Sequence, residues 1–164
     1  MPAYHITWVT HNSRVSERMV TYRVPSGDPV LLTPEQEVEI TQSILRTVRH
    51  NNITVLAFNC CIDHVHIILV CHPNRRDPLV GRLKSESTKR YKSKHRIENE
   101  FHLWAQKYDR RIIENDNYLF NTIEYVRFNR YWHQLPPNPG LRPVVTQMVT
   151  EIANVKNWKY PKWI

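Results

Sequence analysis

Two histidines separated by a single residue, His64 and His66, stand in a stretch that is otherwise strongly apolar. The residues from 59 to 70 predict a tight turn followed by a strand. Because side chains alternate between the two faces of a strand, both imidazoles point the same way, about 7 Å apart along the backbone. The opposite face of this strand is expected to anchor in a core through its apolar side chains: Val65, Ile67 and Leu69.

Two interpretations of this histidine pair are open. The first is a strand with two polar residues on its wetter face, which is the common explanation for an isolated pair. The second is a site for one divalent metal ion, because two imidazoles on one face of a rigid strand can converge on a shared cation. The flanks of His64 and His66 are almost entirely apolar, and burying imidazoles without partners is costly. The sequence therefore favours a metal site.

The length and composition indicate one cytoplasmic domain. A chain of 164 residues fits a single domain with a sizeable core. No apolar run approaches the length of a membrane span, and the residues after Met1 lack the features of a secretion signal. Cys60, Cys61 and Cys71 have neither disulfide-framework nor zinc-ribbon spacing, so reduced cysteines in the core are expected.

The charge of the chain points to a polyanionic partner. The net charge is +8 and the isoelectric point is near 9.6, and nucleic acid is the commonest partner of such a basic domain. Basic residues cluster at 75–76 and from 82 to 96. The alternative for each of them is an ordinary solvated helix face.

The order of predicted elements indicates an α+β, ferredoxin-like split βαβ fold with an antiparallel central sheet. Both crossover helices are expected to cover the sheet face that carries Val65, and an added C-terminal helix to face the histidines. The expected strands are residues 4–10, 53–59, 64–70 and 108–113, with a short hairpin at 19–24 and 30–32. The expected helices are 33–50, which opens with a capping box at Thr33 and Gln36, a helix opened by Asp77 and Pro78, 115–131 and 144–155.

The helix at 115–131 carries a tyrosine and an asparagine on one stripe. Tyr125 and Asn129 are four residues apart, so their side chains are neighbours. A tyrosine that attacks phosphate needs a metal nearby, and Asn129 could supply the third ligand of that metal. Taken alone, the pair is better explained by Tyr125 as an amphipathic residue at the edge of a core, because tyrosine and asparagine are common and the spacing is unspecific. The helix gains meaning only together with His64 and His66.

With these residues placed, the chain resembles the REP-associated tyrosine transposases, within the single-tyrosine HUH transposases. The motif His64-Val65-His66 matches the family's pattern of histidine, bulky hydrophobic residue, histidine. Tyr125 to Asn129 matches the tyrosine helix, with Arg130 where the family usually has proline. Leu83-Lys84-Ser85 and the segment 104–113 match as well. The resemblance spans about residues 4–131, and the extension at 138–164 has no counterpart that we can place.

The resemblance implies a mechanism and a set of partners. A magnesium or manganese ion would be held by His64, His66 and Asn129, and Tyr125 would attack a phosphate of single-stranded DNA. The expected products are a 5′-phosphotyrosine enzyme and a free 3′-hydroxyl, which a second strand can rejoin. The expected DNA carries hairpins, and the enzyme is expected to be a monomer or a homodimer. The candidates for a basic DNA groove are Arg75, Arg76, Arg82, Lys84 and Lys89.

Two other functions compete with this one. The first is a non-catalytic nucleic-acid-binding protein, because the ferredoxin-like fold also serves RNA-recognition modules, although the aromatic signature of those modules is missing here. The second is a metal-dependent hydrolase with water as the nucleophile. The sequence does not reveal which DNA sequence or hairpin is recognised.

Overall fold

A computed structural model describes residues 1–152 of the chain. Four strands form one antiparallel sheet in the order β2–β3–β1–β4. Their bounds are β1 Ala3–Val9, β2 Thr54–Cys60, β3 His64–Val70 and β4 Asp109–Ile113. Because β3 lies between β1 and β2, the sheet has the split βαβ order of a ferredoxin-like fold. The predicted fold class is confirmed.

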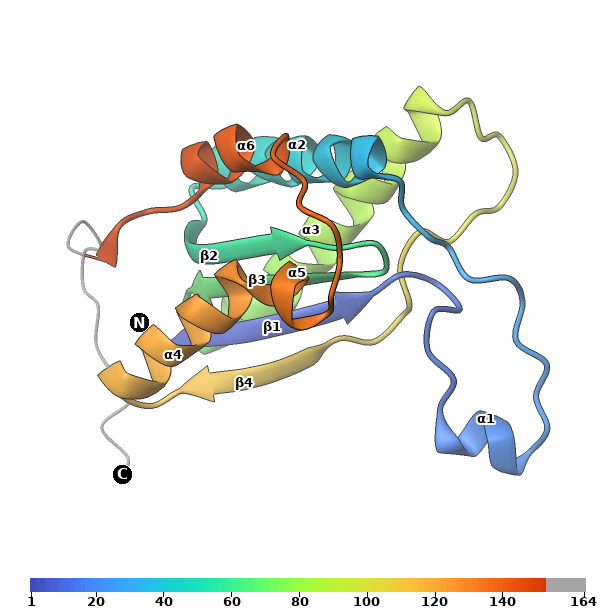
Figure 1. Ribbon diagram of the computed structural model, residues 1–164, viewed down its shortest axis with the longest axis horizontal. Coiled ribbons are helices and arrows are strands. Elements are labelled where there is room, and N and C mark those ends of the chain that lie inside the picture. The colour runs from blue at the N-terminus through green and yellow to red at the C-terminus, as the bar shows by residue number, and fades with distance from the viewer. Residues whose placement is uncertain (153–164) are drawn as a thin grey trace.

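The helices lie on both sides of this sheet (Figure 1). They are α1 Glu17–Thr21, α2 Pro34–His50, α3 Pro73–Lys94, α4 Asp116–Arg127, α5 Asn129–Trp132 and α6 Leu141–Met148. In Figure 1, α3 runs behind the sheet, α2 lies above it on the side of β2, α4 crosses in front of it, and α6 lies beside α2. The tyrosine-bearing helix therefore lies on the opposite side of the sheet from the crossover helices.

The side of the sheet under α2 and α3, here called the core face, is a continuous apolar layer. Val65, Ile67 and Leu69 of β3 are fully buried there against residues of both helices. The sequence starts α2 sharply, because the Thr33 hydroxyl accepts from the Gln36 amide at 3.2 Å and the Gln36 side chain accepts from the Thr33 amide at 3.0 Å. The predicted capping box and the predicted core-facing residues of β3 are confirmed.

A bulge in β2 changes which of its side chains face α4. The pairing of β2 with β3 shifts between Val55 and Ala57, so one extra residue interrupts the alternation of faces. Residues Leu56 and Ala57 both pack under α4, and Phe58 returns to the core face. The next residue, Asn59, pairs with His66. The bulge therefore puts the Asn59 amide on the side of the sheet that carries the histidines.

The predicted hairpin at 19–24 and 30–32 is wrong. This stretch contains the short helix α1, whose N-terminus is capped by the Ser16 side chain, and the part of it from 22 to 32 is irregular. None of the residues of α1 is buried, so α1 has no apolar face to pack on the sheet, whereas Leu32 at the far end of the segment is buried in the core. Two backbone bonds, from Val30 to His11 and from Leu32 to Ile62, tie it to neighbouring loops instead.

Three helix boundaries differ from the predictions. Helix α3 begins at Pro73, because the His72 side chain caps it, and it continues through Pro78. Helix α4 ends at Arg127, with α5 following as a separate turn, and the last described helix ends at Met148. The aromatic tail at 158–164 lies outside the described residues.

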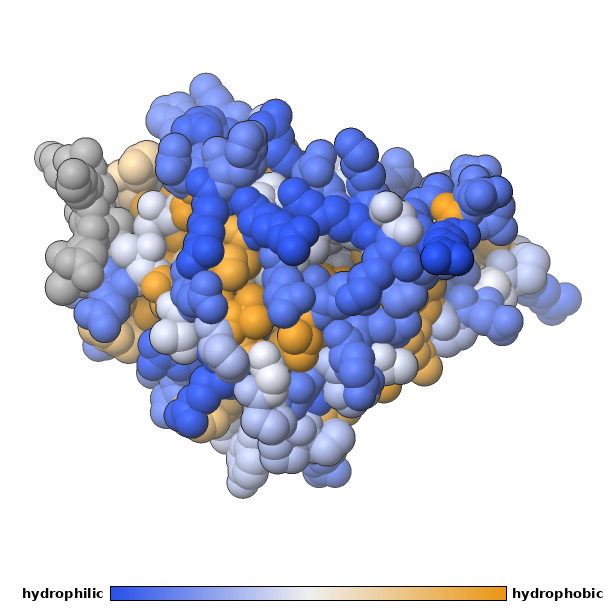
Figure 2. All heavy atoms as spheres, turned by 90° about the horizontal axis from the view of Figure 1, so that it is seen from above, coloured by the Kyte–Doolittle hydropathy of each residue, from blue (hydrophilic) through white to orange (hydrophobic). Residues whose placement is uncertain are grey.

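The described surface is mostly polar. Seen from the side of α2 and α6, hydrophilic residues cover most of the molecule, and apolar side chains show in a limited central area (Figure 2). Within residues 1–152, no helix has both the length and the apolarity that a bilayer span requires.

Candidate metal and tyrosine site

The side of the sheet under α4, here called the histidine face, carries a row of polar residues across all four strands. The strand pairing puts Asn59 of β2 opposite His66 of β3, His66 opposite Thr7 of β1, and Thr7 opposite Asp109 of β4. Residues paired across strands project from the same face of a sheet. The histidine motif thus belongs to a polar band that the local sequence does not reveal.

The two histidines are buried and are held by polar neighbours. Only 4% of His64 and 6% of His66 is exposed. The Nδ1 atom of His64 lies 2.6 Å from Oδ1 of Asp63, and Nδ1 of His66 lies 2.9 Å from the Thr7 hydroxyl and 3.0 Å from Nε2 of His5. When each Nδ1 carries a proton toward these acceptors, both Nε2 atoms keep a lone pair. This arrangement is the usual way in which proteins orient histidine ligands.

Asn129 completes the expected ligand set. Its side chain is fully buried, and Oδ1 lies 2.7 Å from Nε2 of His64 and 3.5 Å from the Cys61 thiol. The Nδ2 group has no hydrogen-bond partner among the described residues. A buried donor without a partner is rare, and a water molecule or a phosphate oxygen beside this NH₂ group would satisfy it. The amide oxygen and two imidazoles are suitable donors for a divalent cation.

The break between α4 and α5 determines where Asn129 lies. The amide of Asn59 donates to the carbonyl oxygens of Val126 and Arg127, at 2.9 and 3.4 Å. These carbonyls lie in the last turn of α4, where intrahelical hydrogen-bond donors run out. Phe128 then separates α4 from α5, and Asn129 starts the new turn with its side chain at His64.

The two histidines differ in their protonation. Burial lowers the pKa of His64, but hydrogen bonds with Asp63, Cys61 and Asn129 outweigh it and raise that pKa to about 10. Burial, reinforced by the neighbouring His64, lowers the pKa of His66 to about 3. At neutral pH the metal-free site therefore holds one imidazolium and one neutral imidazole. A cation that binds here must replace the proton on His64 Nε2.

The candidate nucleophile lies beside this pair. The ring of Tyr125 is edge-on to the His66 ring, with centroids 5.4 Å apart, and 41% of the residue is exposed. It lines a cleft of about 480 Å³ between α4 and the strands β1 and β4. Arg111 and Asp109 both line this cleft and form an ion pair at 3.6 Å. The structure thus brings together His64, His66, Asn129 and Tyr125.

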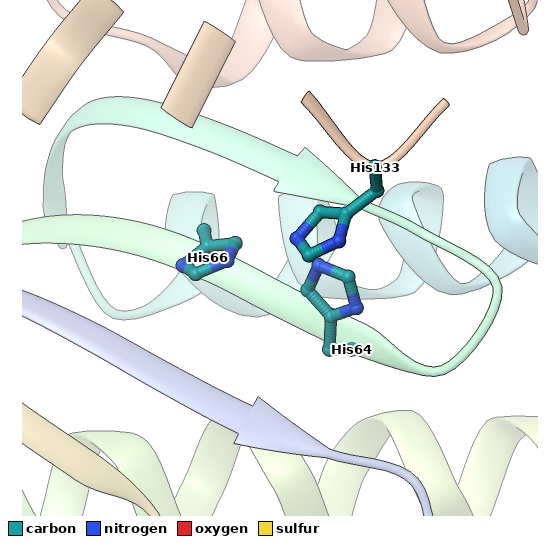
Figure 3. Close-up of side chains that lie close together, drawn as sticks. All are labelled: His64, His66 and His133. Carbon is teal, nitrogen blue, oxygen red and sulfur yellow. The ribbon is translucent and has the colours of Figure 1, made fainter. Parts of the chain in front are cut away.

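Two further histidines at this site were not predicted. His5 stacks on His66 at 5.1 Å between ring centroids. His133, at the end of α5, has a ring nitrogen within 4.8 Å of nitrogens of His64 and His66. Figure 3 shows the rings of His64 and His133 pointing toward one another. The alternation of His5 and Thr7 along the first strand placed them on one face, but only the strand order puts them next to His66.

The predicted DNA-binding residues lie on α3, which covers the core face, so the sheet separates them from the histidines. Three of them already have partners: Arg76 bonds Asp77, Arg82 bonds Asn51, and the Lys84 ammonium donates to the carbonyl oxygens of residues 105–107. The side chains of Arg75 and Lys89 are exposed and make no hydrogen bond or ion pair with described residues. These two are the least engaged of the five.

Arg130, in the position where proline was expected, links both sides of the molecule. Its guanidinium donates to Oε2 of the buried Glu37 on α2 at 2.6 Å and to the Pro136 carbonyl oxygen at 2.8 and 2.9 Å. Asn138 also donates to Glu37, at 2.8 Å. The arginine that departs from the family pattern thus ties α5 to the crossover helix α2.

Comparisons with known proteins identify a similar fold and a family. The structure is similar to that of a REP-associated tyrosine transposase bound to a REP hairpin, with a TM-score of 0.51 and 16% identity over 80% of this chain and 68% of that one. A candidate transposase from Deinococcus radiodurans gives 0.46 and 17% over 84% and 94%. No curated protein sequence matches significantly. The model of the IS200-like transposase family matches residues 3–129, from the first strand to Asn129. The chain therefore belongs to the family of IS200-like transposases.

Proposed function

We propose that this transposase is a metal-dependent enzyme that cleaves and rejoins single-stranded DNA through a 5′-phosphotyrosine intermediate. The observation that carries the proposal is the position of Tyr125, whose ring stands 5.4 Å from that of His66 at the wall of an open cleft. A phenol in the interior could not reach a DNA strand, and a phenol far from the histidines could not use their cation.

The residues of the site divide the chemistry between them. His64, His66 and Asn129 would hold the ion, magnesium or manganese, which supplies Lewis-acid stabilisation of charge on the phosphate oxygens. The Tyr125 oxygen attacks phosphorus, the bond from phosphorus to the 3′ oxygen breaks, and that oxygen leaves as a hydroxyl after taking a proton. The phenolic proton is lost in the same step. Because a phosphodiester is kept, attack by a second 3′-hydroxyl regenerates the phenol and rejoins DNA without ATP.

The charges of the molecule support DNA as the substrate. The net charge of +8 favours a polyanion. The structurally similar transposase holds a REP hairpin, and we propose DNA next to a hairpin for this chain as well. The strand to be cut would enter the cleft, and the flanking DNA would reach Arg75 and Lys89 on α3.

A matched pair of variants tests the nucleophile. Tyr125→Phe removes the attacking oxygen, and Tyr118→Phe removes a second phenol that lines the same cleft on the same helix. Labelled single strands that contain hairpins are incubated with each full-length protein and Mn²⁺, and denaturing gels report the covalent adduct. We expect an adduct with the wild type and Tyr118→Phe and none with Tyr125→Phe, while binding of uncut DNA is unchanged.

The same experiment separates the competing functions. A non-catalytic binder would shift DNA in native gels and form no adduct with any variant. A hydrolase that uses water would release free ends and would be indifferent to Tyr125→Phe. An adduct formed by Tyr125→Phe at the wild-type rate would show that another residue is the nucleophile.

A further inference from the structure

We infer that His133 is a further ligand of the ion at this site, so that three imidazoles bind it and the site prefers softer divalent ions such as Co²⁺ or Zn²⁺ to Mg²⁺. The inference rests on the proposed function, because it assumes that His64 and His66 bind a cation. It goes beyond that proposal by adding a residue from outside the matched family region, which ends at residue 129.

The geometry of the three rings carries the inference. Ring nitrogens of His64, His66 and His133 all lie within 4.8 Å of one another. Centroids of the His64 and His133 rings are 4.9 Å apart, with an angle of 65° between the rings. Two nitrogens bound to one ion at about 2.1 Å each can be at most about 4.2 Å apart, so the rings need only a small approach. His133 is exposed, and rotation of its side chain can supply that movement.

The backbone around His133 is fixed rather than loose. His133 ends α5, and the amides of Gln134 and Leu135 donate back to the carbonyl oxygens of Tyr131 and Arg130, at 3.0 and 2.9 Å. These two bonds, with Gln134 in the left-handed region at φ 53°, form a Schellman motif.

Arg130, which precedes this turn, donates to Glu37 and to the carbonyl oxygen of Pro136, which follows it. These bonds fix the residues on either side of His133. The imidazole is therefore presented to His64 by a defined turn instead of by a free loop.

The donor set decides which ions the site takes. Mg²⁺ prefers oxygen ligands and keeps several waters, whereas imidazole suits later divalent transition metals. Two imidazoles and one amide oxygen are compatible with Mg²⁺ or Mn²⁺. A third imidazole shifts the balance toward nitrogen-binding ions. Removal of His133 should therefore weaken binding of Co²⁺ much more than binding of Mg²⁺.

The test measures metal binding and needs no DNA. Purified full-length protein is titrated with CoCl₂, MnCl₂ and MgCl₂, and calorimetry gives the affinity, while the visible absorption of bound Co²⁺ reports the ligand set. The variants are His133→Ala, His133→Gln and His64→Ala. The matched control is His102→Ala, an exposed histidine in the groove along α3.

We expect His133→Ala to weaken Co²⁺ binding at least tenfold, within the ~10–100-fold range seen when the surroundings of a metal are altered, and to change the Co²⁺ spectrum. His133→Gln should do the same, because it keeps size and polarity but removes the imidazole. Mg²⁺ affinity should change less than about threefold, and His102→Ala should match the wild type.

Two results would overturn the inference, and they are distinguishable. If His64→Ala abolishes Co²⁺ binding while both His133 variants keep wild-type affinity and spectrum, His133 is not a ligand, but the proposed function stands. If the wild type binds none of the three ions, both proposals fail.

Discussion

The two faces of β3 show how alternate residues of one strand serve different purposes. Val65 and Ile67 on the core face are fully buried, and His64 and His66, which alternate with them, are buried almost as completely. Val65 and Ile67 pack against apolar side chains of the core, whereas the imidazoles form hydrogen bonds with polar side chains such as Thr7 and Asn129. Burial alone therefore does not distinguish a structural position from a chemical one. The hydrogen-bond partners do, because they orient two imidazoles whose ring nitrogens lie within 4.8 Å of one another.

Substitutions at the neighbouring positions His66 and Ile67 should separate activity from stability, and they have the largest expected effects. His66→Leu replaces a proposed ligand by an apolar side chain of similar size. Metal-dependent cleavage should fall by more than the ~100-fold typical of losing an outer-shell partner, while the free energy of unfolding should change little. Ile67→Ala should do the reverse, because the cavity costs about 2–5 kcal/mol of unfolding free energy. Single-turnover cleavage and urea denaturation measure the two effects. Equal losses of both quantities in both variants would contradict the comparison.

The buried ion pair of Arg130 with Glu37 joins α5 to the crossover helix α2. Breaking this pair should have the next largest effect on stability. Arg130→Met leaves the carboxylate of Glu37, which is 2% exposed, with Asn138 as its remaining side-chain partner. Removing one partner of a buried pair costs about 3–5 kcal/mol. Urea denaturation should show this loss, and Co²⁺ binding should weaken as the turn that carries His133 loosens.

The double variant Glu37→Met and Arg130→Met is the control for this pair. It removes both charges, so no isolated carboxylate stays buried, and most of the lost stability should return. A double variant that is no more stable than Arg130→Met would show that the link acts by packing and not by charge.

What the sequence could predict follows from the range of the interactions involved. The capping box of α2 and the alternation along β3 are local patterns, and both were found. The position of Asn59 depends on a one-residue bulge, and that of His133 on a helix break that Asn59 stabilises. Both depend on contacts between residues far apart in the chain. The predicted hairpin failed for a related reason, since the backbone amides of Val30 and Leu32 donate to His11 and Ile62, which lie in loops far away in the sequence or beyond the second strand.

The opposite pKa shifts of the two histidines predict a stability maximum near pH 6.5 for the metal-free protein. His64 has a folded pKa of about 10, above the ordinary 6.5, so its contribution is full below pH 6.5 and is lost as the pH rises toward 10. His66 has a folded pKa of about 3. Between pH 6.5 and 3 its ring is therefore protonated in the unfolded chain but neutral in the folded protein, and stability falls as the pH drops through this range. Urea denaturation with EDTA across this range measures both slopes.

Asp63→Asn is the matched control for the alkaline side of this profile. The hydrogen bond with Asp63 is the largest of the contributions that raise the pKa of His64, so the variant should flatten the loss above pH 6.5. The variant also removes a carboxylate whose own pKa is lowered, chiefly by the hydrogen bond with His64, and with it a part of the stability loss at the acidic end of the range. In the wild type, Co²⁺ affinity should rise with pH over the same alkaline range, because the ion replaces the His64 proton. A Co²⁺ affinity that does not depend on pH between 6.5 and 8.5 would contradict this assignment.

The smallest expected effect is on the salt dependence of DNA affinity in variants of α3. It tests whether the core-face side of the molecule also contacts DNA. Lys89→Met removes an exposed ammonium without a hydrogen bond or ion pair among the described residues, so the slope of log affinity against log salt should fall by about 1. Lys84→Met instead removes the donor to the carbonyl oxygens of residues 105–107. It should cost about 1–3 kcal/mol of stability and leave the salt slope nearly unchanged. Filter binding of a hairpin-containing strand from 50 to 200 mM salt measures the slopes. If Lys84→Met lowers the slope and Lys89→Met does not, the ammonium of Lys84 must leave its carbonyl partners when DNA binds, and α3 takes part in DNA binding through a rearrangement of the loop after residue 104.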